Sequence, residues 1–108
     1  MKSYKVRVTD QAFTDLNAIY EYIDQELLNP DAAVRIYNAL IDGMRALENM
    51  PERIKLMNSE FERKNGLRLM PIENYAIIFT IREDSVYITN IFYGASDIES
   101  KLRGENNS

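Results

Sequence analysis

The chain has 108 residues, with 13 Lys or Arg, 17 Asp or Glu, and neither Cys nor His. A chain of this length forms one domain, and 45% apolar residues suffice for a packed core. The missing Cys and His exclude a thiol nucleophile, an imidazole base, a disulfide framework and the usual zinc ligands, so we expect no metal or cofactor. The net charge of -4 argues against general nucleic-acid binding.

We expect no export signal at the N-terminal segment. Residues 1 to 8 lack a continuous apolar stretch, and no run elsewhere approaches the roughly 18 apolar residues of a membrane-spanning helix. We therefore expect a soluble cytoplasmic protein without membrane contact. Residues 5 to 9 alternate polar and apolar side chains, which predicts a short half-buried strand that ends at Thr9, a residue suited to cap a helix.

Two amphipathic helices are predicted next. Apolar residues recur at three- and four-residue steps over residues 10 to 28, and again over residues 30 to 50, where Pro51 should end the second helix. Between them, Asn29 supplies a capping amide and Pro30 suits the first helical turn. Because the connection is so short, the two helices should form an antiparallel hairpin.

The second half of the chain predicts a sheet. Residues 52 to 65 show no clean period and form a connector, and a short helix is expected at residues 98 to 103, followed by a mobile end at residues 104 to 108. The predicted fold is α+β, a single domain of residues 1 to 103 in which the N-terminal strand and a three-stranded antiparallel meander form one sheet with the helical hairpin on one face. The three strands of the meander are Gly66 to Ile72, Tyr75 to Arg82 and Val86 to Tyr93, joined by segments of hairpin length.

The middle strand of this meander is apolar on both sides. Ile77 and Phe79 point one way, whereas Ala76 and Ile78 point the other. A sheet covered on one face only does not need this pattern. Either the connector or the C-terminal end covers Ile78, or the outer face forms a groove that a partner peptide fills.

Short segments in a fixed order are spread over about nine-tenths of the chain, from residue 4 to residue 97. They comprise Tyr4 to Thr9 with Ala12 and Asp15-Leu16, Ile19 to Ile23, Asn29 to Ala33, Gly66 to Arg68, Pro71 to Tyr75, and Ile91 to Gly94 with Asp97. In order and spacing they resemble the strands, the first helix and the helix turn of the RelE/ParE superfamily, the toxins of bacterial type II toxin-antitoxin modules.

This resemblance implies a ParE-like toxin that inhibits growth when free, is neutralised by a cognate antitoxin in a hetero-oligomer, and serves plasmid stabilisation. RelE-like members cut messenger RNA in the ribosomal A site, which requires a base, cations for the phosphate and an acid. ParE-like members poison DNA gyrase by binding, which requires no catalytic group. The choice between these activities depends on the site residues.

The resemblance also assigns candidate site residues. Arg68 matches the arginine that many members carry on the second strand, and in a nuclease it would stabilise phosphate charge. Tyr93 is a weaker catalytic candidate, because a phenol is a poor base at neutral pH. Residues expected to bind the antitoxin or the target are Arg68, Tyr75, Ile78, Arg82 and Tyr93.

One position departs from the family pattern. Members often carry a basic residue just after the last strand, whereas residues 94 to 97 contain no cation. This departure favours gyrase binding over catalysis. The alternatives are a ribosome-dependent endoribonuclease that uses Arg68, and a degenerate member that binds its antitoxin without toxicity. A simpler interpretation also stands for each residue: Arg68 and Arg82 as surface charge, and Tyr75 and Tyr93 as half-buried core with wet hydroxyls.

Overall fold

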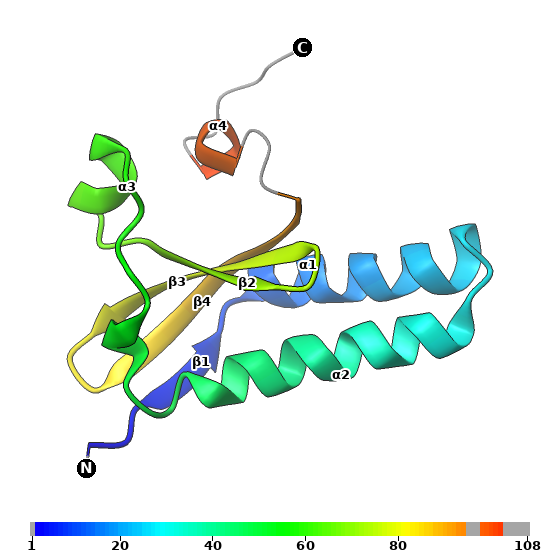
Figure 1. Ribbon diagram of the computed structural model, residues 1–108, viewed down its shortest axis with the longest axis horizontal. Coiled ribbons are helices and arrows are strands. Elements are labelled where there is room, and N and C mark those ends of the chain that lie inside the picture. The colour runs from blue at the N-terminus through cyan, green and yellow to red at the C-terminus, as the bar shows by residue number, and fades with distance from the viewer. Residues whose placement is uncertain (1, 95–97, 103–108) are drawn as a thin grey trace.

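A four-stranded sheet with a helical hairpin on one face makes up the computed structural model, which describes residues 2–94 and 98–102 (Figure 1). The predicted α+β class is therefore confirmed, while the expected mobile end, residues 104 to 108, lies outside the described residues. None of the described helices is long and apolar enough to cross a membrane. The elements are β1 (Lys5–Val8), α1 (Asp10–Glu21), α2 (Pro30–Ala46), α3 (Glu60–Lys64), β2 (Arg68–Ile72), β3 (Tyr75–Arg82), β4 (Ser85–Tyr93) and α4 (Ile98–Leu102).

The sheet has the strand order β1-β4-β3-β2. The last three strands form the predicted antiparallel meander, and β1 lies parallel to β4 at one edge, from Lys5 opposite Ser85 to Val8 opposite Ile88. The other edge strand, β2, carries Pro71, whose missing N–H discourages further strand pairing.

The helical hairpin begins and turns at the predicted caps. The Thr9 hydroxyl accepts a hydrogen bond from the Ala12 N–H at 3.2 Å, and the Asn29 side chain accepts one from the Ala32 N–H at 3.1 Å. Between the helices, residues Tyr22–Glu26 form a π-helical turn rather than a continuation of α1. A π turn holds more residues than an α turn, so it rotates the side chains that follow it.

The second helix ends at Ala46, four residues before the expected position near Met50. The Glu48 carbonyl accepts a hydrogen bond from the Tyr4 N–H at 2.8 Å, which ties the end of α2 to the start of β1. Met50 then adopts the left-handed conformation, with φ of 49°, directly before Pro51. A contact with a residue over 40 positions away therefore ends the helix before the proline can do so.

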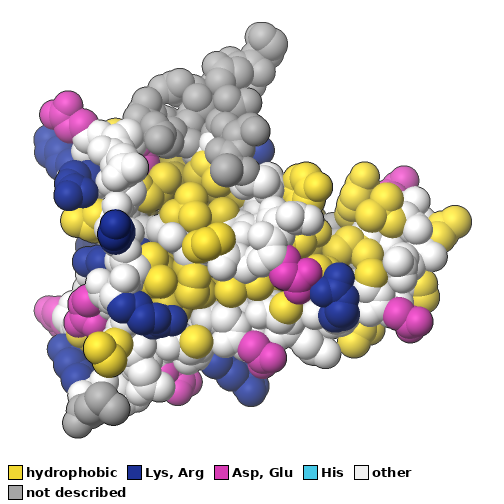
Figure 2. Space-filling view, in the orientation of Figure 1, with side chains coloured by type: hydrophobic (Ala, Val, Ile, Leu, Met, Phe, Trp, Pro, Cys, Tyr) yellow, Lys and Arg dark blue, Asp and Glu magenta, His cyan; other side chains and the backbone are white. Residues whose placement is uncertain are grey.

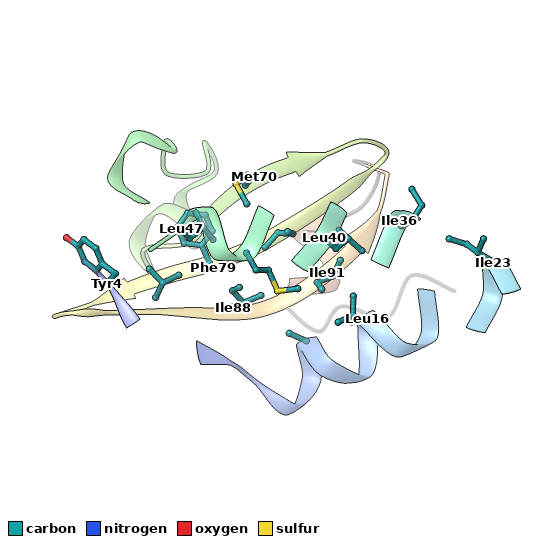
Figure 3. Packing of buried hydrophobic residues seen from close by; sticks show 14 of the residues in the cluster. Tyr4, Leu16, Ile23, Ile36, Leu40, Leu47, Met70, Phe79, Ile88 and Ile91 are labelled. Atoms are coloured by element: carbon teal, nitrogen blue, oxygen red, sulfur yellow. The ribbon is translucent and has the colours of Figure 1, made fainter. Parts of the chain in front are cut away.

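The main core lies between the hairpin and the sheet (Figure 3). Leu16 of α1, Leu40 of α2, Phe79 of β3 and Ile88 of β4 are at most 2% exposed. Gly43 lets α2 approach β2 closely, because a Cβ atom there would lie 2.7 Å from the Ile72 Cδ1.

The outer face of the sheet carries a second, smaller core. Ile78 is fully buried in a cluster with Met57 of the connector, Ala76 of β3 and Ile98 of α4, and Leu102 packs against it. Of the two alternatives for Ile78, coverage by the connector and the C-terminal helix is confirmed. The prediction of an open groove above Ile78 is wrong, because Met57 and Ile98 cover this side chain. Their packing removes the apolar surface of all three residues from water.

Candidate functional site

The sequence-predicted site residues lie at separate positions along the sheet. Tyr75 and Tyr93 are paired at one end of β3, and Arg82 pairs with Ser85 at the other end. At about 3.3 Å per strand residue, these two ends are about 23 Å apart. Arg68 lies between them, opposite Phe79 and about 13 Å along the sheet from Tyr75. Only the two tyrosines come together.

A β-bulge brings these tyrosines together. Phe79 lies opposite Ile88 but Ile78 lies opposite Asn90, so Thr89 is an extra residue in β4. Without it, the register would place Phe92 rather than Tyr93 opposite Tyr75, since a one-residue slip moves every side chain to the other face.

Asp15 of α1 helps to hold the bulged strand. Its Oδ2 accepts a hydrogen bond from the Ile91 N–H at 2.9 Å, just beyond the extra residue. The Thr9 hydroxyl lies 3.3 Å from the Thr89 carbonyl oxygen and donates to it. The start of α1 thus satisfies backbone groups of β4 that β1 is too short to reach.

The tyrosine pair lines an open apolar pocket where the sheet meets the turn of the hairpin. The rings of Tyr75 and Tyr93 are 5.4 Å apart between centroids and inclined by 69°, an edge-to-face contact. The pocket has a volume of about 610 Å³, and Tyr93 is 68% exposed and Tyr22 57% exposed. We call it the tyrosine pocket; its lining residues are Ala18, Ile19, Tyr22, Leu27, Tyr75 and Tyr93.

The tyrosine pocket is weakly polar, and its surroundings favour the neutral form of the Tyr75 phenol over the phenolate. Burial raises the pKa of Tyr75 above its ordinary value, and the neighbouring Tyr93 and Glu73 raise it further. Near the pocket, Arg35 Nη1 donates hydrogen bonds to both carboxylate oxygens of Glu73 at 2.9 Å, so this cation is already paired. None of the described residues that line the pocket is a cation, so its neutral phenols are suited to apolar contact rather than to phosphate binding.

Arg68 lies in a structural network on the connector. Its Nη1 donates a hydrogen bond to the Ile54 carbonyl oxygen and a longer one, 3.4 Å, to that of Glu52. The Tyr4 hydroxyl donates to the Glu52 carboxylate, and this bond lowers the pKa of Glu52 and raises that of Tyr4. Arg68 therefore fastens the connector to β2, with its guanidinium turned toward backbone carbonyls.

Two further predicted residues lie away from the tyrosine pocket. Arg82 is exposed beside the turn between β3 and β4. Ile78 lies beneath Met57 and Ile98, so a partner could contact it only after moving α4. No group of metal-ligating side chains capable of holding an ion occurs among the described residues.

Sequence reasoning missed Tyr22 and Leu27 as members of the pocket. Leu27 belongs to the apolar period predicted over residues 10 to 28, which would bury its side chain, but after the π-helical turn it is 56% exposed. The available signal was the pair Leu27-Leu28 directly before the Asn29-Pro30 cap, because apolar residues at the end of a helix have no core to cover them. Figure 2 shows hydrophobic side chains at the end of the molecule where the hairpin turns, and Lys and Arg gathered toward the opposite end.

Several solved structures have a similar fold, and two of them belong to toxin-antitoxin systems. The chain is similar to the chromosomal ParDE system from P. aeruginosa, with TM-score 0.72 and 20% identity over 86% of this chain and 98% of that chain. It is also similar to the RelBE2 toxin-antitoxin complex from Mycobacterium tuberculosis, with TM-score 0.63 and 22% identity over 84% and 98%. A conserved hypothetical protein from Helicobacter pylori has TM-score 0.53 and 13% identity over 83% and 93%.

The fold is that of a RelE/ParE superfamily toxin, as the resemblance in the sequence predicted. The family model described as ParE toxin of the type II toxin-antitoxin system, parDE, matches residues 6–98. The chain therefore belongs to the ParE toxin family. Comparison with curated protein sequences gave no match.

Proposed function

We infer that this ParE-family toxin inhibits growth by binding DNA gyrase and that a cognate antitoxin neutralises it. The observation that carries this proposal is the tyrosine pocket. It is apolar, open and aromatic, and such pockets accept an apolar anchor from a protein partner. Membership of the ParE family supports gyrase as the target rather than the ribosome.

Cleavage of messenger RNA would place different demands on the site. The reaction needs cations beside the scissile phosphate and groups that move protons. Arg68 lies about 13 Å along the sheet from the tyrosine pair and donates to connector carbonyls, and Arg35 is paired with Glu73. The charges near Tyr75 and Tyr93 are therefore a poor match to a pentavalent phosphate.

A cognate antitoxin is the expected regulator. The structures similar in fold include the ParDE system and the RelBE2 complex, which supports a hetero-oligomer for this chain. An antitoxin segment that inserts an apolar side chain between Tyr22 and Tyr93 would cover the pocket that binds gyrase. Neutralisation and toxicity would then compete for the same surface.

Induction of the chain in bacteria without a partner tests this proposal. We expect growth arrest, and we expect Tyr93→Ala to relieve it, whereas Arg82→Ala at the far end of the sheet should not. Toeprinting on translating ribosomes should show no A-site cleavage. Cleavage that disappears with Arg68→Ala would establish the endoribonuclease instead, and normal growth with abundant soluble protein would identify a degenerate member.

A further inference from the structure

The helical hairpin carries a second apolar surface, on the side that the sheet does not cover. Tyr20 of α1 and Tyr37 of α2 form its floor; their rings are 5.8 Å apart between centroids, meet edge-on at 82° and pack against the core. Val34 forms one wall and is 48% exposed, and Phe13, nearby on α1, is 52% exposed. We call this surface the outer groove; its lining residues Asn17, Tyr20, Val34 and Tyr37 enclose about 420 Å³, and Phe13 lies one helical turn before Asn17.

The outer groove is distinct from the tyrosine pocket. Tyr20 and Tyr22 are two residues apart in the sequence, so their side chains leave the helix in directions about 200° apart. Tyr20 lines the groove, whereas Tyr22 lines the pocket. Occupation of one surface therefore leaves the other accessible.

The shape of the outer groove suits a helix. Phe13 and Tyr20 are seven residues apart on α1, and Val34, Tyr37 and Ile41 follow three- and four-residue steps on α2. Such rows form the ridges on either side of a furrow between antiparallel helices, and a third helix packs its own ridge into that furrow. Phe13 and Val34 are the exposed members of these rows, and their position beside the half-buried tyrosines marks an interaction surface rather than scattered surface hydrophobics.

The charges around the outer groove are strongly one-sided. The stretch from residue 10 to residue 29 contains no Lys or Arg. Glu21 follows Asn17 by four residues within α1, which places it on the groove side of that helix, and it is exposed. Asp31 and Asp42 are exposed on α2, where Arg45 is also exposed. The ion pair found on α2 among the described residues joins Arg35 to Glu73 and involves neither Asp31 nor Asp42. The acidic residues of the stretch are Asp10, Asp15, Glu21, Asp24 and Glu26, of which Asp15 faces β4 and does not border the groove.

We propose that the outer groove binds a cationic amphipathic helix of a partner protein, with apolar residues on one face and Lys or Arg on its flanks. The apolar face fills the furrow between Phe13 and Val34, and the flanking cations meet the acidic rims of α1 and α2. The same carboxylates repel nucleic acid and anionic lipid, which leaves a protein helix as the occupant.

Titration of the isotope-labelled chain with synthetic helical peptides tests the proposal. The probe is a Leu/Lys amphipathic peptide about as long as α2, and its matched control has every Lys replaced by Glu. We expect the Lys peptide to bind at least about tenfold more tightly at about 0.05 M salt, with the difference shrinking at about 0.5 M. Backbone amide shifts should change at Phe13, Tyr20, Val34 and Tyr37.

Variants of exposed residues connect the binding to this groove. Val34→Glu should abolish binding of the Lys peptide, while Leu28→Glu, at an exposed leucine outside the groove, should leave it unchanged. Glu21→Gln with Asp42→Asn changes no apolar contact and should remove most of the preference for Lys over Glu. Both peptides binding equally, or shifts confined to Tyr22 and Tyr93, would overturn the proposal. Concentration-dependent shifts without peptide would assign the groove to a second copy and would overturn it too.

Peptide binding is independent of toxicity. Because the titration uses the purified chain alone, a failed growth assay with retained Lys-peptide binding would refute gyrase poisoning and keep the outer groove. Growth arrest without Lys-peptide binding would refute the outer groove and keep gyrase poisoning.

Discussion

Replacement of Arg68 by Ala removes the link between β2 and the connector. The hydrogen bond to the Ile54 carbonyl is charge-assisted, and such bonds stabilise by about 1.5–3 kcal/mol each. The second contact, to the Glu52 carbonyl, is 3.4 Å long and adds little. Because the guanidinium is only partly buried, we expect a loss of about 1–2 kcal/mol in the free energy of unfolding.

Urea denaturation followed by circular dichroism measures this loss. With an m-value of about 1.5 kcal/mol per M, the midpoint should fall by about 1 M. Arg82→Ala is the matched control, since it removes an exposed arginine at the far end of β3, and its change should stay within about 0.5 kcal/mol. Growth inhibition by Arg68→Ala should decrease only as far as the folded fraction decreases.

The opposite result would refute this reasoning. If the urea midpoint of Arg68→Ala were unchanged while growth inhibition disappeared, Arg68 would act on the target directly. The hydrogen bonds to the connector would then be incidental, and the nuclease alternative would regain support.

Three further changes test the packing and the titrating groups. Leu40→Ala, at a fully buried site between the hairpin and the sheet, should lower the free energy of unfolding by about 2–5 kcal/mol in a urea titration, and a smaller loss would mean that the core collapses around the cavity. Because burial raises the pKa of Tyr75, stability should be full below about pH 10 and fall as pH rises through the folded pKa; Tyr75→Phe should reduce this alkaline loss, and an unchanged profile would contradict the assigned shift. Because the hydrogen bond from Tyr4 lowers the pKa of Glu52, its contribution is present above the ordinary value of 4.5 and lost as pH falls through the folded pKa; Glu52→Gln should flatten the acid limb of the stability curve, and an equally steep limb would argue against the bond.

Local chemistry made much of the fold predictable. The β3 boundaries, Tyr75–Arg82, agree with the prediction because turn residues flank a run of β-branched and aromatic side chains. The Asn29-Pro30 cap lies where its capping amide and proline require. These signals act within a few residues, so the sequence displays them directly.

Contacts between distant residues were not predictable in the same way. The hydrogen bond from Tyr4 to Glu48 ends α2 early, and the π-helical turn exposes Leu27. The parallel pairing of β1 with β4 gives no hairpin signal, because the two strands are separated by most of the chain.

In the candidate site, too, the residues were predictable from local sequence but their contacts with distant residues were not. Tyr75 and Tyr93 were both identified from the sequence, but the bulge at Thr89 decides that they face each other. Arg68 was identified by its family position, yet its partners are carbonyls of a connector that had no clear pattern. Ile78 follows the alternation of β3 correctly, and only the packing of α4 shows that it is buried.

We propose that this ParE-family chain acts by binding gyrase through the tyrosine pocket. The most direct measurement is a DNA supercoiling assay with purified gyrase and a stoichiometric excess of the chain. Our account predicts inhibition of supercoiling that Tyr93→Ala abolishes and Arg82→Ala retains. Full supercoiling in the presence of the folded, growth-inhibiting chain would contradict it.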